Sequence, residues 1–142
     1  MIVAHILNQK GRDVATIQPD KTMADVVAIL GKRKFGALVV AEADGRILGI
    51  VSERDVVKVL ARDGAGALGD KVAKHMTSQV VTCAADDTID LVMQAMTKGR
   101  FRHMPVAEAG KLGGIISIGD VVKARIDEMA SESQALREYI NS

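Results

Sequence analysis

The chain has 142 residues, a size that forms one compact domain and needs no disulfide or metal to build a core. Nineteen basic and eighteen acidic side chains leave a formal net charge of +1, so no overall field attracts nucleic acid or an anionic membrane. A hydrophobic share of 48% argues against disorder, and an aromatic share of 2% leaves few rings for stacking on single-stranded bases.

The single cysteine, Cys83, cannot form an internal disulfide, which is compatible with a reducing compartment. The first residues lack the basic segment and long apolar run of a signal peptide, and no apolar run reaches the roughly 18 residues of a membrane span. We therefore expect a cytoplasmic protein.

An internal repeat sets the order of the predicted elements. Residues 14–40 recur at a constant shift of 66 positions, and the shift becomes 65 after the turn at residues 44–46. A one-residue deletion in a surface turn explains the change. Each copy predicts a βαββα unit.

The first copy begins with a short lead-in helix at residues 3–7, whose pattern returns at residues 72–76. A strand at 14–17 follows, and then an amphipathic helix that Thr22 and Asp25 begin as a capping box and Gly31 ends. Strands at 37–41 and 47–51 flank an Asp44-Gly45 pair, which is typical of a hairpin, and a second helix begins at Ser52.

The second copy predicts a strand at 80–83, a helix ending at Gly99, two further strands and a helix from Ser117. Two such units bury their apolar sheet faces against each other, which predicts an α/β (α+β) fold with pseudo-twofold symmetry. The predicted divisions are a first repeat with its lead-in helix, a glycine-rich linker, a second repeat and a C-terminal helical extension, at residues 1–62, 63–71, 72–126 and 127–142.

The last helix carries apolar residues at three- and four-residue steps and is interrupted by Ser133; they are Val122, Ile126, Met129, Leu136 and Ile140. Two interpretations stay open. The helix packs back on its own domain, or it forms a dimer contact.

Ser52 with Asp55, and Ser117 with Asp120, stand at the two strand-to-helix junctions. One interpretation is a capping box that stabilises the helix alone. The other is a ligand site, because free N–H groups at a helix start receive a phosphate and a nearby carboxylate accepts hydrogen bonds from ribose hydroxyls.

Basic residues gather before one strand of the second copy, at Lys98, Arg100, Arg102 and His103. The first copy has Gly36 and Ala37 where Arg102 and His103 stand, so we expect the two copies to bind a ligand with different strength. The alternative is an ordinary solvated surface.

The repeated Gly-Ile-Val/Ile-Ser-x-x-Asp motif, the run from Arg102 to Val106 and the leading Val-x-Thr strand together resemble the CBS domain pair, or Bateman module. The resemblance extends from about residue 3 to residue 123. It implies a regulatory module, usually dimeric, that binds an adenosine nucleotide in two clefts between the copies. Position by position, it implies one cleft made by Asp13, Val14, Ala37, Arg102, His103, Ile115, Ser117 and Asp120. It implies a second cleft made by Ile50, Ser52, Asp55, Gln79, Val80 and Phe101, to which we add Arg54 as a phosphate contact.

No nucleophile elbow, Walker A loop or dinucleotide fingerprint is present, and the three histidines lack metal-ligand spacing. We expect no enzyme and no metal site, but a module that senses AMP, ADP, ATP or NAD and signals to a separate protein. The alternatives are a scaffold with empty clefts, and a nucleic-acid binder using residues 32–34 and 98–100.

Overall fold

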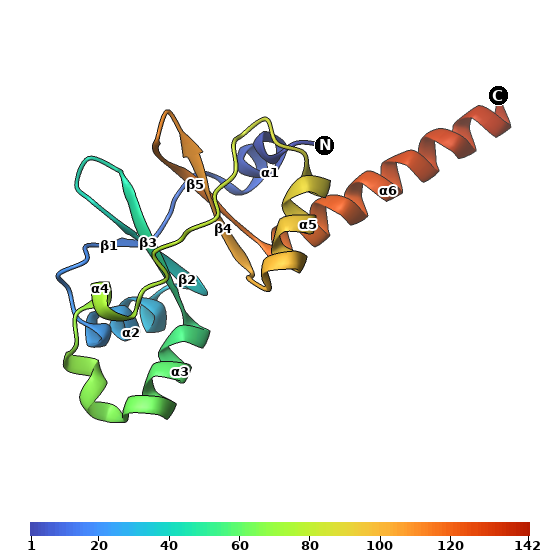
Figure 1. The fold of residues 1–142 in the computed structure, drawn as a ribbon. Coiled ribbons are helices and arrows are strands. Elements are labelled where there is room, and N and C mark those ends of the chain that lie inside the picture. The colour runs from blue at the N-terminus through green and yellow to red at the C-terminus, as the bar shows by residue number, and fades with distance from the viewer.

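The computed structural model describes residues 1–142 and shows two units side by side, with one long helix leaving the molecule (Figure 1). The first unit contains β1 (Thr16–Ile17), α2 (Met23–Lys32), β2 (Ala37–Ala41), β3 (Ile47–Ser52) and α3 (Glu53–Asp63). The second contains α5 (Ile89–Gly99), β4 (His103–Glu108), β5 (Lys111–Ser117) and α6 (Ile118–Asn141). Three further helices are α1 (Val3–Lys10), the 3-10 helix η1 (Ala65–Gly69) and α4 (Val72–His75).

The predicted local signals form as expected in the first unit. Thr22 caps α2 by accepting a hydrogen bond from the Asp25 backbone, and the Asp25 carboxylate accepts one from the Thr22 N–H. In the hairpin between β2 and β3, Gly45 has a φ of 91°, a conformation that glycine adopts without strain. β2 pairs with β1 in parallel and with β3 in antiparallel, so the sheet order is β1-β2-β3.

The strand predicted at residues 80–83 does not form, and this prediction is wrong. Only Cys83 pairs with β4, through an isolated bridge to Val106, and the second sheet has two strands. In the first unit the Val39 N–H donates to the Ala15 carbonyl. The repeat places Pro105 at the position of Val39, and proline has no N–H to donate, so the ladder cannot extend toward residue 81.

The lead-in helices are exchanged between the units. The buried residues of α1 join the second unit's core, and Leu7 packs over Gly114 of β5. Val72 of α4 joins the first unit's core, and Met76 packs over Gly49 of β3. The segment predicted as a linker also contributes, because Ala67 of η1 is buried in the first core. The predicted division points stay predictions, but by packing α1 belongs with the second unit.

The two sheets pack on each other as predicted, through a small apolar cluster formed by Val39, Ala41 and Ile115. The Leu112 N–H donates to the Gly45 carbonyl at 2.9 Å, which joins the two hairpins. This mixed helix and strand arrangement confirms the predicted fold class.

α6 differs from one predicted detail, the interruption at Ser133, and from one of the two interpretations left open for it, the packing back on its own domain. It runs without interruption through Ser133, and its second half extends into solvent instead of packing back on the domain (Figure 1). Serine costs an exposed helix well under 1 kcal/mol, so a single one does not end it. No helix here is both long enough and apolar enough to cross a bilayer.

Candidate functional site

The two strand-to-helix junctions are true capping boxes. Ser117 Oγ accepts a hydrogen bond from the Asp120 N–H at 3.1 Å, and Asp120 Oδ2 accepts one from the Ser117 N–H at 2.9 Å. Ser52 and Asp55 repeat the pattern at 3.3 and 2.8 Å. Such caps stabilise a helix by about 1 kcal/mol. They leave the Oδ1 atom of each carboxylate available to a ligand, so capping and ligand binding are compatible.

The β4-β5 hairpin gathers the second unit's predicted residues. His103 pairs with Ser117 across the hairpin, and the Arg102 carbonyl accepts a hydrogen bond from the Ile118 N–H at 2.8 Å. Since Ser117 also begins α6, the hairpin brings Arg102, His103 and Ser117 to the start of that helix, beside Asp120.

His103 reaches across to the first unit. A Cβ added to Gly36 would lie 3.1 Å from His103 Nε2, so the glycine makes room for the imidazole. The Gly36 carbonyl accepts a hydrogen bond from the Glu53 N–H, and Ala37 pairs with Ser52. The starts of α3 and α6 therefore meet around His103. We call this place the helix-start junction, formed by Gly36, Glu53, His103, Ser117 and Asp120.

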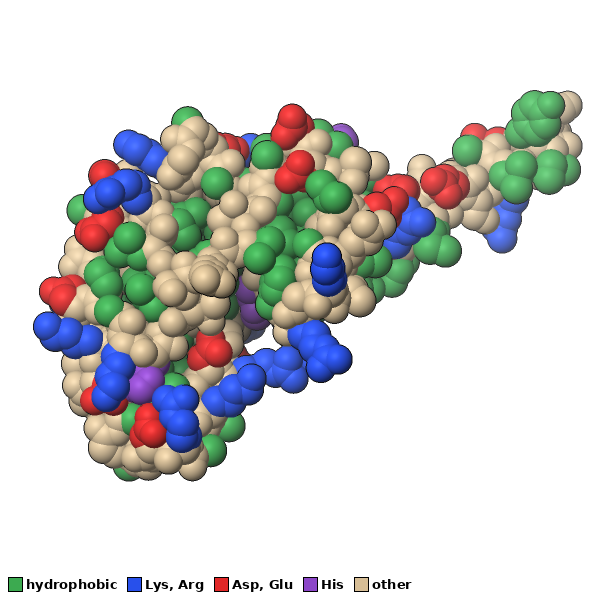
Figure 2. Space-filling view, viewed as in Figure 1, with side chains coloured by type: hydrophobic (Ala, Val, Ile, Leu, Met, Phe, Trp, Pro, Cys, Tyr) green, Lys and Arg blue, Asp and Glu red, His purple; other side chains and the backbone are tan.

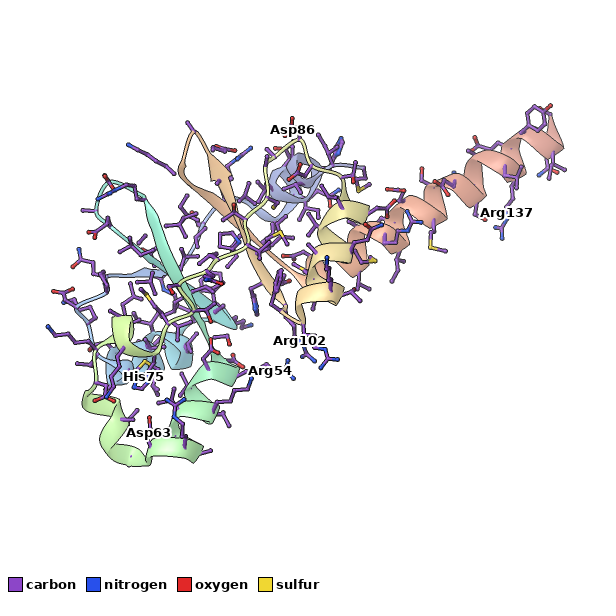
Figure 3. All side chains as sticks on the ribbon, in the orientation of Figure 1. Arg54, Asp63, His75, Asp86, Arg102 and Arg137 are labelled. Atoms are coloured by element: carbon purple, nitrogen blue, oxygen red, sulfur yellow. The ribbon has the colours of Figure 1, made fainter.

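Charges of both signs surround His103. Burial is the main cause that lowers the pKa of this imidazole, and Lys10 and Arg102 act in the same direction. Glu53 and Asp120 oppose them without reversing the shift. Arg54 and Arg102 lie at the same end of the molecule, one on each unit (Figure 3). A ligand at the junction therefore meets cations from both units.

Lys10 is the residue that the sequence analysis missed. Its ammonium group lies 2.7 Å from Asp120 Oδ2 and also donates to the Ile115 carbonyl at 3.0 Å. Burial raises the pKa of Asp120, but the hydrogen bonds from Lys10 and Ser117 outweigh burial and lower it. The lead-in helix was predicted to end at residue 7, whereas Gly11, a common residue after a helix end, marks its end after Lys10. That signal would have placed Lys10 in the last turn.

The ion pair leaves little space at Asp120. The hollow there measures about 90 Å³ and is lined by Ile6, Gln9, Lys10, Asp120, Lys123 and Ala124. Pockets for small-molecule ligands usually measure roughly 300–1,000 Å³. A nucleotide at Asp120 therefore requires Lys10 to move.

Two larger hollows lie elsewhere, one on each unit. One of about 510 Å³ is lined by β1 and α2, including Thr16 and Ile17, and one of about 310 Å³ by their repeat counterparts Thr82 and Cys83 together with α5. None of the predicted site residues lines either hollow. Cys83 is buried in the second core, and burial, aided by Asp87, raises the pKa of its thiol to about 12, which disfavours the thiolate.

The remaining predicted residues are more dispersed. Val14 and Ile50 pack between the sheets, and the Ile50 backbone exchanges two hydrogen bonds with Thr77. Phe101 packs against Gly99 and the second unit's core. Asp13 and Gln79 are exposed and Val80 is half-buried. Their roles as ligand contacts stay predictions. No group of three or more His, Cys, Asp or Glu side chains is placed to hold a metal ion.

Comparison with known proteins agrees with this duplicated architecture. The family model described as the CBS domain matches residues 4–62 and 71–127. The mitochondrial CBS domain-containing protein CBSX3 of Arabidopsis thaliana is 34% identical over 125 residues, which cover 85% of this chain and 61% of that relative.

Solved structures show the same fold. The CBS-domain containing protein ATU1752 of Agrobacterium tumefaciens is 52% identical, with a TM-score of 0.84 over 87% of this chain and 92% of that one. The CBS domain protein PAE2072 of Pyrobaculum aerophilum, solved in complex with AMP, has a TM-score of 0.79 at 24% identity over 92% of this chain and 99% of that one. Since the family model matches in each half and the solved relatives fold alike, the chain belongs to the CBS domain family, with two CBS domains in tandem.

Proposed function

We propose that the chain is a regulatory module that binds an adenosine nucleotide, AMP, ADP, ATP or NAD, at the helix-start junction. The observation that carries this proposal is the meeting of two capped helix starts, from different units, around His103 and Asp120. Helix starts favour a phosphate, and a carboxylate favours a ribose diol. Two proteins of the same fold support the ligand class, because one was solved with AMP and the other with 5′-methylthioadenosine and S-adenosyl-L-methionine.

Binding would exchange the partner of Lys10. In the free protein Lys10 neutralises Asp120 and fills the space beside it. In the bound protein the ribose hydroxyls would donate to Asp120, and the ammonium group would turn to the phosphate. The exchange gives the ammonium group an anionic partner and leaves the half-buried carboxylate hydrogen-bonded, so no charged group is buried without a partner that binds it.

We propose no reaction for the junction, and the signal would pass to a separate protein, which we expect in the cytoplasm. Lys10 lies at the end of α1, which packs in the second unit's core, and the chain continues from there to β1 of the first unit, so its movement would shift the two units relative to each other.

Isothermal titration calorimetry with AMP, ADP, ATP and NAD tests the proposal. In Asp120→Ala, we expect binding to weaken by about 1–3 kcal/mol, the range for losing a hydrogen bond to a charged group. Asp25→Ala is the matched control, because it breaks an equivalent capping box at α2 while the junction stays intact.

Absence of heat from all these ligands at millimolar concentration would favour a scaffold with an empty junction. Weakening by Asp25→Ala instead of Asp120→Ala would move the site to the hollow beside α2, which Asp25 lines. The nucleic-acid alternative depends on the exposed basic residues at 32–34, 98 and 100. Retardation of a nucleic acid in a low-salt gel shift would support it.

A further inference from the structure

α6 presents an apolar stripe to solvent along most of its length. α6 has 24 residues, whereas its repeat counterpart α3 has 11, and the added turns extend beyond both units (Figure 1). The five side chains of the stripe are between 44% and 71% exposed, and green side chains follow the projecting helix (Figure 2); the five are Val122, Ile126, Met129, Leu136 and Ile140. Burying such side chains is favourable by about 1.5–3 kcal/mol each, so the stripe is suited to a partner.

The spacing of the stripe identifies the kind of partner. With Ser133 included, the positions advance in alternating steps of four and three, which is the a and d pattern of a heptad repeat. The a positions are Ile126, Ser133 and Ile140, and the d positions are Val122, Met129 and Leu136. A repeat of 3.5 residues keeps one narrow stripe facing a second helix along its whole length.

The stripe remains accessible while α6 is anchored to its own unit. Val121 and Ala124 are the residues of α6 buried in the second core. At about 100° per residue, the stripe lies roughly a third of a turn around the helix from that buried face. A partner helix can therefore lie along α6 without displacing it from the domain.

The flanking charges select the partner and its direction. In a parallel pair of α6 helices, each g position faces the e position five residues further along the other helix. Glu132 is a g position and Arg137 is an e position, so Glu132 of each copy meets Arg137 of the partner subunit. In a fully overlapping antiparallel pair, Glu132 of one helix would face Glu132 of the other, and Lys123 of each helix would face Arg137 of the other. Both contacts place like charges together. The charge pattern therefore fits a parallel second copy.

We propose that α6 pairs with α6 of a second copy as a parallel two-stranded coiled coil over residues 122–140. The capping box of Ser117 and Asp120 lies at the start of the same helix, so the two ends of α6 have separate roles. Its first turn belongs to the helix-start junction, and its later turns hold the two copies together. This pairing does not depend on nucleotide binding, and either proposal can fail alone.

Cysteine cross-linking of the full chain tests the pairing and its direction. A parallel register places the two residues at position 133 opposite each other, so Ser133→Cys should form a disulfide-linked dimer under mild oxidation. Ser131→Cys is the matched control, because position 131 points away from the stripe and the exchange is chemically identical. Both positions are exposed and helical, so folding is retained, and the native Cys83 is buried.

A charge exchange gives a second measurement by sedimentation equilibrium. Arg137→Glu should weaken a parallel dimer about tenfold, as expected when two attractive pairs become repulsive, and adding Glu132→Arg should restore it. In an antiparallel dimer Arg137→Glu would strengthen association, because Lys123 would gain a partner. The proposal is overturned by that result, by a wild-type monomer at millimolar concentration, or by equal cross-linking of the two cysteine variants.

Discussion

At the residue scale, the decisive contact is the pair of Lys10 and Asp120. The two residues are 110 positions apart in the chain, and each side chain is between a quarter and a third exposed. The pair joins an element before the first repeat to the last helix of the second. Its value to stability is modest at this exposure, but its position controls access to the carboxylate.

Replacing Lys10 separates the two roles proposed for it. Lys10→Met keeps the length of the side chain and removes the charge, so we expect uncharged adenosine to bind more tightly and AMP to lose a phosphate contact. The ratio of AMP affinity to adenosine affinity should fall about tenfold, the effect of one charge-assisted contact. Calorimetry with both ligands measures it.

Lys58→Met is the control for that experiment, since Lys58 lies on the exposed face of α3 and forms no ion pair. Its affinity ratio should match that of the wild-type protein. An unchanged ratio in Lys10→Met would show that the ammonium group never reaches the phosphate.

His103 makes stability depend on pH in a defined direction. Burial, with help from Lys10, lowers the pKa of His103 below its ordinary value of 6.5, so the unfolded chain binds this proton more readily than the folded chain. The stability associated with neutral His103 is complete above pH 6.5 and decreases as the pH falls below it. Urea denaturation at about pH 7.5 and about pH 5.5, on either side of that value, should show a larger loss in the wild-type protein than in His103→Gln. Equal losses in the two proteins would remove His103 as the cause.

At the element scale, the packing of the lead-in helices on the sheets depends on two glycines at equivalent positions in the repeats, Gly49 and Gly114. A Cβ on Gly49 would lie 2.6 Å from Met76 Sδ and 2.9 Å from the Thr77 carbonyl oxygen, and the latter is fixed backbone. We therefore expect Gly49→Ala to destabilise the protein by about 1–3 kcal/mol, as overpacking does.

Gly31→Ala is the matched control with the opposite sign. Gly31 lies within α2, and a Cβ added there would have no heavy atom within 4 Å. Alanine favours a helix by about 1 kcal/mol over glycine, so this variant should be more stable. Urea unfolding curves compare the two, and a stable Gly49→Ala would mean that the region after α4 is loosely attached to β3.

The elements were predictable where a local signal fixes them. Capping boxes marked the starts of α2, α3 and α6, and Asp44-Gly45 marked the first hairpin. The strand at 80–83 failed because the lost donor belongs to Pro105, on a different element. The sequence could not predict that α1 packs in the second unit or that Lys10 pairs with Asp120. An apolar pattern does not say which core a helix joins, and a basic residue does not say which carboxylate it contacts.

At the scale of the whole molecule, the exchanged helices make the two units interdependent. The second core includes Val3, Ile6 and Leu7 from before the first repeat, and the first core includes Val72 from before the second. Neither core is complete without a segment that the chain attaches to the other unit. This arrangement predicts one cooperative unfolding transition rather than two.

A destabilising change in one unit should therefore lower the unfolding midpoint of both. Gly114→Ala tests this, because its Cβ would lie 2.8 Å from Leu7 Cδ2, and the three atoms nearest to it all belong to Leu7 of the second core. Pulsed hydrogen exchange at increasing urea, followed by digestion and mass spectrometry, reports peptides from each unit separately. We expect peptides from β2 and from β5 to lose protection at the same lowered urea concentration. Two separate midpoints, with β2 still at its wild-type value, would mean that the exchanged helices do not couple the units and that a ligand at the junction has no rigid path between them.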